Sequence, residues 1–481
     1  MERILTNSQM READLWTIEK LGISHDELVE RTGKALFDEI NKRFMGGRVL
    51  VCIGVGNNGE DGKVLARLLS KKYGFNVQIF NVESSLFKIF DNKFDIIVDC
   101  IFGTGLNREV QGRYKKTIEF INNSNSFVIS CDIPSGLNGD TGIPMGVAVR
   151  ANLTVAIQEF KLGHFLNYGR DYCGETVNKD IGISIWGDNY VTRLSTNSVK
   201  KFFEPRDINV HKGLYGKACV VGGSKNLPGS VNLSYNALSS LLVGAGYSTI
   251  AFPESLYNAY ALVNPECTVY TIKDSDGQII FNKENVDGLL KYDSIGFGMG
   301  LGVSKEVYDV LCYIISNYKG RLLIDADGLN SLSKFGIDVL KNSTCEIVIT
   351  PHIGEFSRLV NKPTNEVLLD SINLAKEFAK EYNVTVILKS ATSIITNGIQ
   401  VVLNTTGCSG MAKGGSGDVL SGILTGLLAR RMDFYETCCV APFIFGISGE
   451  LAQTETNEYS LLASDIVKKL PTVISSFISS K

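Results

Sequence analysis

Short apolar runs alternate with stretches of helical periodicity along most of the chain. In the first half, apolar runs at 48–53, 94–101 and 127–131 each end in a loop rich in glycine, asparagine or aspartate. In the second half, SIGFGMGLG, RLLIDADGLNSL, EIVITPHIGEFSRL and TVILKSATSII repeat the arrangement, as apolar strands that end in polar or glycine-rich loops. Strands that are apolar throughout and alternate with helices are typical of parallel sheets covered by helices. We therefore predict an α/β fold.

One segment interrupts this rhythm. Residues 192–205, TRLSTNSVKKFFEP, continue neither a strand nor a helix pattern, so we predict a linker there and a boundary near residue 200. The domains we expect are 1–198, a Rossmann-like three-layer domain, and 199–481, a second α/β domain. The second domain opens over residues 211–252 with a strand, a glycine-rich turn, a helix and another strand.

Composition narrows the function. The 481 residues are 44% hydrophobic and 21% charged, enough for a large core, and the net charge of -3 with a pI near 6.0 argues against nucleic acid or anionic membrane as the main partner. We expect small-molecule partners. No apolar run approaches the roughly 18 residues of a bilayer span, and no signal peptide is evident, so we expect a cytoplasmic protein. The 11 cysteines form no CxxC pair, which favours neither a disulfide framework nor a zinc site.

Glycine-rich and acidic loops follow the first three apolar runs. Gly54, Gly56 and Gly59 form a GxGxxG motif between a strand and a helix, which by itself is only weak evidence for dinucleotide binding. Because ligands bind beyond the carboxyl ends of parallel strands, the three loops should converge on one site.

The oxygen-bearing side chains in these loops suit a hard cation or substrate hydroxyls; they are Asn57, Asn58, Asp99 and Ser135. Asp132 is aimed by the rigid Pro134 turn and is a candidate acid/base. Each loop aspartate, including Asp61, could instead be a turn former or a helix cap.

The second half centres on GGSGD. Gly414, Gly415 and Gly417 allow successive N–H groups to converge on an anion, and the amphipathic pattern that begins at Asp418 predicts a helix whose N-terminus reinforces the attraction. The alternative is a simple helix entry with Asp418 as its N-cap.

Other candidates in this half also have structural alternatives. Asp325 and Asp327 could be solvated caps of the following helix, and His352 could be a satisfied loop histidine. Lys389 ends an apolar strand, where a lysine usually meets an anion.

The first half resembles the NAD(P)H-hydrate epimerases through GVGNNGEDGKVLAR, DCIFGTGLNREVQGRY and CDIPSGLNGDTG. The resemblance covers roughly residues 1–190. It implies that Asn58, Asp99 and Ser135 hold potassium and that Asp132 contacts the substrate and moves the proton. The other substrate contacts it implies are Asn57, Asn58, Gly59, Glu60, Asp61, Gly103, Thr104, Gly105, Leu106, Asn107, Arg108 and Glu109.

The second half, from about residue 205 to 475, resembles the NAD(P)H-hydrate dehydratases, which have a ribokinase-like fold. The motifs occur in order: HKGLYG, VVGGS, GFGMGLG, DADGLN, TPHIGEF, LKSATSII and GCSGMAKGGSGD. The resemblance implies that Asp418 is the base, with Mg²⁺ also required. It implies hydrate contacts at Gly300, His352 and Asp418, and nucleotide contacts at Lys389, Ser390, Ala391, Thr392, Ser393, Gly415, Ser416 and Gly417.

Together the two resemblances predict a bifunctional repair enzyme. It would interconvert the R and S epimers of hydrated NADH and NADPH (NADHX and NADPHX) and dehydrate the S epimer with ADP, and we expect a homo-oligomer. The alternatives are a ribokinase-like small-molecule kinase fused to a non-catalytic nucleotide-binding module and, less favoured, a nicotinamide dehydrogenase.

Overall fold

The computed structural model describes residues 1–87, 93–187, 190–227, 229, 242–260 and 268–478. The chain divides into two compact units. One is formed by Arg3–Val191, and the other by Met1–Glu2 together with Thr192–Lys481. No helix in the described ranges combines the length and the apolar character needed to cross a bilayer. The functional division at residue 198 stays a prediction.

The first unit is built around a six-stranded parallel sheet. In spatial order its strands are β3 (Phe75–Asn81), β2 (Gly47–Ile53), β4 (Ile96–Cys100), β5 (Phe127–Cys131), β6 (Leu153–Ile157) and β8 (Glu175–Lys179). The chain runs outward from β2 to β3 and then returns to β4, so the strand order reverses between β2 and β4. Such a reversal leaves a crevice at the carboxyl ends of the two strands.

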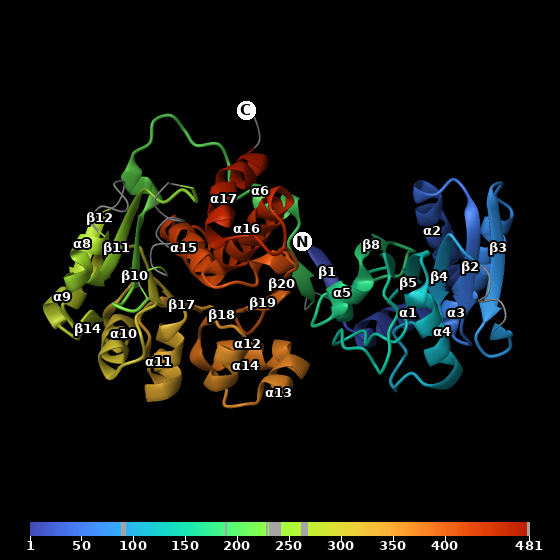
Figure 1. Cartoon of the computed structure of the whole chain (residues 1–481), viewed down its shortest axis with the longest axis horizontal. Coiled ribbons are helices and arrows are strands. Elements are labelled where there is room, and N and C mark those ends of the chain that lie inside the picture. Colours follow the sequence, from blue (N-terminus) through green and yellow to red (C-terminus); the bar gives the residue numbers. More distant parts are fainter. Residues whose placement is uncertain (88–92, 188–189, 228, 230–241, 261–267, 479–481) are drawn as a thin grey trace. The chain divides into compact units, whose positions relative to one another are not determined.

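Helices cover both faces of this sheet, as Figure 1 shows for the blue and green part of the chain. They are α1 (Asn7–Leu21), α2 (His25–Arg43), α3 (Asn57–Ser70), α4 (Gly112–Asn123) and α5 (Gly169–Cys173). Val49 and Val51 pack with residues of α2 and α3, whereas Leu50 and Cys52 share a core with α4. This alternation along β2 produces the three layers predicted for the first domain.

Two further strands, β1 (Glu2–Leu5) and β7 (Phe160–Lys161), pair in parallel through Ile4 and Leu5. The turn after β1 caps α1, because the Thr6 hydroxyl accepts from the Gln9 N–H while the Gln9 side chain accepts from the Thr6 N–H. β7 leads directly into a 3₁₀ turn at Leu162–His164. These short elements place α1 and Lys161 beside the carboxyl edge of the main sheet.

The second unit contains a longer, mixed sheet. In spatial order its strands are β12 (Thr268–Ile272), β11 (Tyr247–Pro253), β10 (Lys217–Gly222), β15 (Ser294–Met299), β16 (Arg321–Ile324), β17 (Glu346–Ile349), β18 (Thr385–Leu388), β19 (Ser393–Thr396), β20 (Val401–Asn404) and β9 (Val191–Arg193). Neighbours are parallel from β12 to β18, and β18, β19 and β20 are antiparallel. A hairpin of β13 (Asp274–Ser275) and β14 (Gln278–Ile279) stands apart.

Helices also cover both faces of the second sheet (Figure 1). One face carries α6 (Thr196–Lys200), α15 (Ser416–Ala429), α16 (Phe434–Glu455) and α17 (Ala463–Phe477), and the other carries α10 (Lys305–Asn317), α11 (Asp327–Phe335), α12 (Ile353–Leu359), α13 (Thr364–Leu369) and α14 (Ser371–Tyr382). The short helices α8 (Tyr257–Tyr260) and α9 (Lys283–Asp287) lie near the β12 end. The arrangement matches the ribokinase-like fold expected for this half.

Helix α15 differs from its sequence-based prediction. The pattern after Asp418 predicts an amphipathic helix, yet every residue from Val419 to Ala429 is buried between the sheet and α16. Gly296 on β15 permits this close approach, because a Cβ there would lie 2.3 Å from the Thr425 hydroxyl. The helix predicted between β10 and β11 falls mostly outside the described residues.

Candidate active sites

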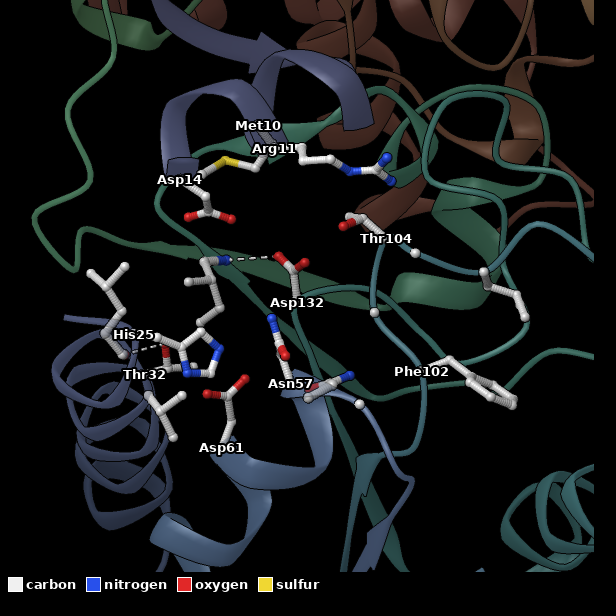
Figure 2. A pocket seen from close by; sticks show the side chains of 18 of the residues that line it. Met10, Arg11, Asp14, His25, Thr32, Asn57, Asp61, Phe102, Thr104 and Asp132 are labelled. Carbon is white, nitrogen blue, oxygen red and sulfur yellow. Dashed lines mark hydrogen bonds between the residues drawn. The ribbon is translucent and has the colours of Figure 1, made fainter. Parts of the chain in front are cut away.

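A cavity of about 650 Å³ opens at the carboxyl ends of β2 and β4 in the first unit, where the strand order reverses (Figure 2). Helices α1, α2 and α3 contribute to its wall, as do the loops after β4 and β5. Gly54 and Gly59 are required for the turn from β2 into α3, since a Cβ on either would lie 2.1 Å from a backbone oxygen. The glycines of the GxGxxG motif thus shape the cavity floor.

Asp132 faces this cavity and is paired with a lysine that the sequence analysis missed. Lys161 Nζ forms an ion pair with Asp132 Oδ1 and also donates to the Ile157 carbonyl at 2.7 Å. The Lys161 side chain is only 1% exposed, while that of Asp132 is 18% exposed. A buried ammonium group requires such partners. The pair therefore presents one carboxylate, held in a fixed position, to the cavity.

The backbone of Asp132 is also constrained. Its φ is 63°, in the left-handed region, and its N–H donates to Val155 O at 2.8 Å. His164 Nδ1 accepts from the Lys161 N–H at 3.0 Å, which leaves Nε2 of the neutral ring to donate to Asp132 O at 2.7 Å. Strained conformations of this kind cluster at functional sites.

Two further carboxylates line the same cavity. Burial raises the pKa of Asp14 to about 6, with Asp132 adding to the rise while Lys161 and His25 oppose it. Burial, reinforced by the charges of Asp132 and Asp14, raises the pKa of Asp61 well above its ordinary value. Carboxyl groups with displaced pKa values in one cavity are characteristic of acid/base sites.

Of the three residues predicted to hold potassium, Asn58 lies on the cavity wall, and Asp99 and Ser135 are hydrogen-bonded to each other. Asp99 is fully buried and accepts from the Ser135 hydroxyl at 2.5 Å, the Ser135 N–H at 2.8 Å and the Ser130 hydroxyl at 2.9 Å. Burial raises the pKa of Asp99 and these hydrogen bonds oppose the rise. Asn58 Oδ1 is buried without a hydrogen-bond partner in the described residues, an arrangement that suits a cation ligand. The three residues fit a monovalent cation in donor chemistry.

Some of the residues predicted to contact the hydrate line this cavity, and others do not. Of the predicted contacts, the cavity wall includes Asn57, Asn58, Asp61, Gly103, Thr104, Gly105, Leu106, Asn107, Arg108 and Asp132. The structure does not bring Gly59, Glu60 or Glu109 to the wall, and the Glu60 carboxylate instead pairs with Lys63 at 2.8 Å. On the described residues, therefore, Glu60 acts as a surface ion-pair partner.

In the second unit, Asp325 is the centre of a polar network. It is 2% exposed and accepts from Lys389 Nζ at 2.9 Å and from the Ser421 hydroxyl at 2.6 Å. The interpretation of Asp325 as a solvated cap is therefore wrong, because the carboxylate is buried and charge-paired. Asp327 begins α11 and accepts from the Gly302 N–H at 2.8 Å. As predicted, Lys389 meets an anion.

The GGSGD turn lies beside this network. Gly415, with a φ of 89°, is the N-cap of α15, so Asp418 is a first-turn residue and the interpretation of Asp418 as the N-cap is wrong. Lys389 Nζ lies 3.5 Å from the position a Cβ on Gly417 would occupy. The lysine, the turn and the half-buried Asp418 consequently share one end of the helix, where N–H groups lack partners within the helix.

His352 and Glu355 also lie at this carboxyl edge of the second sheet. His352 caps α12, because its Nδ1 accepts from the Gly354 and Glu355 N–H groups at 3.0 and 3.3 Å, and its side chain is 56% exposed. Burial and the Lys389 charge lower the pKa of His352. Burial raises the pKa of Glu355 while Lys389 opposes the rise. His352 is thus a satisfied cap, and its other ring nitrogen, Nε2, lies 3.5 Å from Glu355 Oε1.

The remaining predicted contacts occupy the loops at the same edge. Gly300 follows β15 with a φ of 68°, and Lys389, Ser390, Ala391 and Thr392 connect β18 to Ser393 at the start of β19. Thr392 Oγ1 is buried without a hydrogen-bond partner in the described part of the chain. Because β15, β16, β17 and β18 are parallel neighbours, the loops that follow them lie side by side.

Sequence reasoning missed Lys161, Asp14 and Glu355. Lys161 is the last residue of the short buried strand β7, in EFKLG, and the rule that singled out Lys389, a lysine at the end of an apolar strand, would have found it. Asp14 carried no such signal, since one aspartate on a helix is usually solvated. Glu355 occupies the third helical position after the His352 cap and is explained locally by the capping box.

Two α/β units, each with carboxylates and a lysine at the carboxyl edge of its sheet, define an enzyme with two separate sites for small anionic molecules. Comparisons identify which enzyme. A family model described as NAD(P)H-hydrate dehydratase matches residues 218–472, and one described as YjeF-related protein N-terminus matches residues 25–92 and 71–163. The chain belongs to the family of bifunctional NAD(P)H-hydrate repair enzymes.

Full-length relatives support this assignment. The bifunctional NAD(P)H-hydrate repair enzyme of Thermofilum pendens is 32% identical over 96% of this chain and 94% of the relative, and that of Archaeoglobus fulgidus is 32% identical over 95% of each. Among solved structures, the ADP/ATP-dependent NAD(P)H-hydrate dehydratase of Bacillus subtilis, co-crystallised with ATP and Mg²⁺, is 26% identical with a TM-score of 0.52. The match covers 60% of this chain and 99% of that one.

Proposed function

We propose that the two repair reactions divide between the two units. The first unit interconverts the R and S epimers of NADHX and NADPHX, and the second dehydrates the S epimer at the expense of ADP, which yields NAD(P)H, AMP and phosphate. The observation that carries this division is the presence of an acid site in each unit, Asp132 with Lys161 in the first and Asp418 in the turn near Lys389 in the second, in the order of the two family motifs.

In the first unit, charge orients the substrate. Arg11 and Arg108 lie on the cavity wall, as do the carboxylates of Asp14, Asp61 and Asp132 (Figure 2). The diphosphate of the hydrate binds towards the arginines, and the hydrated ring binds towards the acids. Asp132 then exchanges the proton of the 6-hydroxyl, with Lys161 and the Ile157 N–H holding its carboxylate in place.

Potassium, when bound, supplies a positive charge beneath this cavity. Asn58, Asp99 and Ser135 would hold the ion, and the orphaned Asn58 oxygen is the observation that favours it. Exchange of K⁺ for tetramethylammonium at constant ionic strength is expected to lower the epimerase rate and leave dehydration unchanged. Equal epimerase rates in the two salts would remove the ion from the proposal.

In the second unit, Asp418 takes the proton of the 6-hydroxyl, and the freed oxygen attacks the terminal phosphate of ADP. N–H groups of Gly415, Ser416 and Gly417 stabilise the charge that develops on this phosphate. Phosphate then leaves with the C6–O electron pair as the N1 lone pair pushes into the ring, and loss of a proton from C5 restores the C5=C6 double bond of the dihydronicotinamide. Gly300 and His352 contact the hydrate, and Lys389, Ser390, Ala391, Thr392 and Ser393 contact the nucleotide.

The carboxyl edge of the second sheet offers carboxylate oxygens, which are ligands that Mg²⁺ prefers. No three metal-binding side chains gather within the described residues, but Mg²⁺ usually binds one or two carboxylates together with substrate phosphates. Asp325 and Glu355, both buried and electrostatically coupled, are the residues that would hold it. When bound, it neutralises negative charge on the phosphates during transfer.

A two-nucleotide assay tests the proposal. The full chain is incubated with mixed R and S hydrate and either ADP or ATP, and the epimers, NAD(P)H and phosphate are separated over time. We expect both epimers to disappear, phosphate to equal NAD(P)H, and ADP to be preferred, since the fused arrangement resembles the bacterial one. A stable phosphorylated product would instead establish a small-molecule kinase, and persistence of the R epimer would make the first unit a binding module.

Replacement of Lys389 tests the nucleotide site. Lys389→Met removes a charged donor worth about 1.5–3 kcal/mol, so KM for ADP is expected to rise roughly 10- to 100-fold. Steady-state dehydration at varied ADP measures this, and the exposed Lys362→Met variant is the matched control. Because Asp325 would lose its charged partner, thermal unfolding of the Lys389→Met variant checks that the rise in KM does not come from unfolding. An unchanged KM for ADP in Lys389→Met would show that the nucleotide does not contact Lys389.

A further inference from the structure

Asp14 occupies an unusual position for a helical aspartate. On α1, Met10, Ala13 and Thr17 are buried against the unit's core, and half-buried Asp14 lies beside them on the cavity wall. Figure 2 shows the carboxylates of Asp14, Asp61 and Asp132 around the same space. They come from α1, α3 and the loop after β5, so three different elements supply the acids.

Charges act on the Asp14 carboxylate from a distance, with Lys161 and His25 favouring its ionised form. Within the described residues its side chain makes no hydrogen bond or ion pair, although burial opposes its ionisation. A helix cap, a surface ion pair or a turn would each provide such a partner. A desolvated carboxyl group without a structural partner, placed on a cavity wall, is best explained by a role towards a ligand.

The charged neighbours of Asp14 and Asp61 differ, and they affect the pKa values of the two carboxyl groups differently. Asp14 is close enough to Lys161 and His25 for their charges to oppose the effects of burial and of Asp132, and its pKa stands at about 6. Asp61 is influenced by acids only, namely Asp132, Asp14 and Glu60, and its pKa lies well above its ordinary value. A group that exchanges protons during turnover needs a pKa near the working pH, which favours Asp14.

Epimerisation at C6 requires two proton-transfer groups. A base removes the hydroxyl proton, the oxygen electron pair forms C6=O, the C6–N1 bond breaks, and its electron pair on N1 takes a proton from an acid. The open-chain aldehyde then turns its other face to N1. The nitrogen attacks C6 while N1–H returns its proton to the acid, and the oxygen regains a proton from the base. No electron or atom is gained, and both groups end as they began.

We propose that Asp14 is the second acid/base residue of the epimerase site, exchanging the proton of the ring nitrogen while Asp132 exchanges that of the hydroxyl. This inference rests on the proposed epimerase function of the first unit. It adds a catalytic residue on α1 to a site that the sequence motifs place on α3 and on the loops after β4 and β5.

The test uses the full chain with Asp14→Asn. With ADP present, the S epimer should still be consumed at the wild-type rate, and the R epimer should be consumed about 10- to 100-fold more slowly than in wild type after subtraction of spontaneous epimerisation. This loss lies at or below the lower end of the roughly 10²–10⁴-fold that is usual for general acid–base catalysis, because solvent water can partly replace the lost acid. Glu19→Gln, which removes an exposed carboxylate from the same helix, is the control and should behave as wild type.

The pH profile distinguishes catalysis from a structural role. The protonated fraction of Asp14 falls as the pH rises through about 6, so the wild-type epimerase rate should fall over this range, and the fall should be absent in Asp14→Asn. Asp14→Glu should recover part of the rate. An Asp14→Asn rate and profile equal to wild type would overturn the role of Asp14, as would a lower rate with an unchanged profile. Lack of epimerisation in the wild-type chain would instead overturn the function of the whole unit.

Discussion

Asp418→Asn is expected to abolish ADP-dependent dehydration while epimerisation continues. If Asp418 is the base that activates the 6-hydroxyl, its loss should lower the rate by about 10²–10⁴-fold, the usual contribution of such a group. Asparagine keeps the size of the side chain and removes its negative charge and its basicity. The recovery of dihydronicotinamide absorbance from the S hydrate measures the loss, and exchange between R and S in the same sample reports on the first unit.

The structure limits the other effects of this substitution. Because Gly415 and not Asp418 caps α15, the change leaves the cap intact and removes a favourable charge–dipole interaction of roughly 0.3–1 kcal/mol. The helix itself is buried and should remain folded. Asp207→Asn, an exposed aspartate of the same unit, is the matched control. Dehydration by Asp418→Asn at more than about a tenth of the wild-type rate would rule out this residue as the general base.

The fold was largely predictable because both units are built on apolar parallel strands. Runs such as RVLVCI and FDIIVDCI are apolar throughout and cannot be confused with half-exposed strands, and β2 and β4 form where they occur. The alternation of strands and helices along the chain then identified the fold class as α/β. Strand order was not available, because it depends on contacts between distant segments.

Burial was harder to predict than secondary structure. The pattern after Asp418 correctly predicted a helix, but a repeat of apolar residues interrupted by serine, threonine and glycine resembles an amphipathic surface helix. In the structure these small polar residues are buried, as the Ser421 hydroxyl bonds to Asp325 and the Thr425 hydroxyl to Ser421 O. A small hydroxyl that satisfies itself on the backbone or a buried acid is invisible to periodicity.

The two candidate sites differ in how much the sequence reveals. Loop residues such as Asn58, Asp99 and Ser135 were found because they follow strands, and the structure brings them together. Lys161 and Asp14 were missed because they reach the cavity from β7 and α1, which are not part of the main sheet. These two side chains reach the cavity only through the packing of α1 at the edge of the sheet. No local sequence motif indicates that packing.

Asp132→Asn is expected to stop epimerisation and leave dehydration of the S epimer intact, so that the R epimer persists while the S epimer is consumed. The expected loss is again about 10²–10⁴-fold, measured above spontaneous epimerisation. Asparagine is the correct replacement here, because the φ of 63° at this position strains most residues and asparagine tolerates it. Asp140→Asn is a poor control since Asp140 bonds to the Asn7 N–H, whereas exposed Asp171 on α5 is suitable.

Lys161 determines how this result is to be interpreted. Asp132→Asn leaves an ammonium group that is 1% exposed without its carboxylate, and breaking a buried pair typically destabilises a protein by about 3–5 kcal/mol. Asp132→Asn/Lys161→Met removes both charges and should recover much of this stability in thermal unfolding, yet it should remain inactive as an epimerase. If the double variant regained epimerase activity with its stability, Asp132 would serve to neutralise Lys161, and its assignment as the acid/base would be wrong. Loss of activity that persists in a well-folded double variant places the proton transfer on this pair.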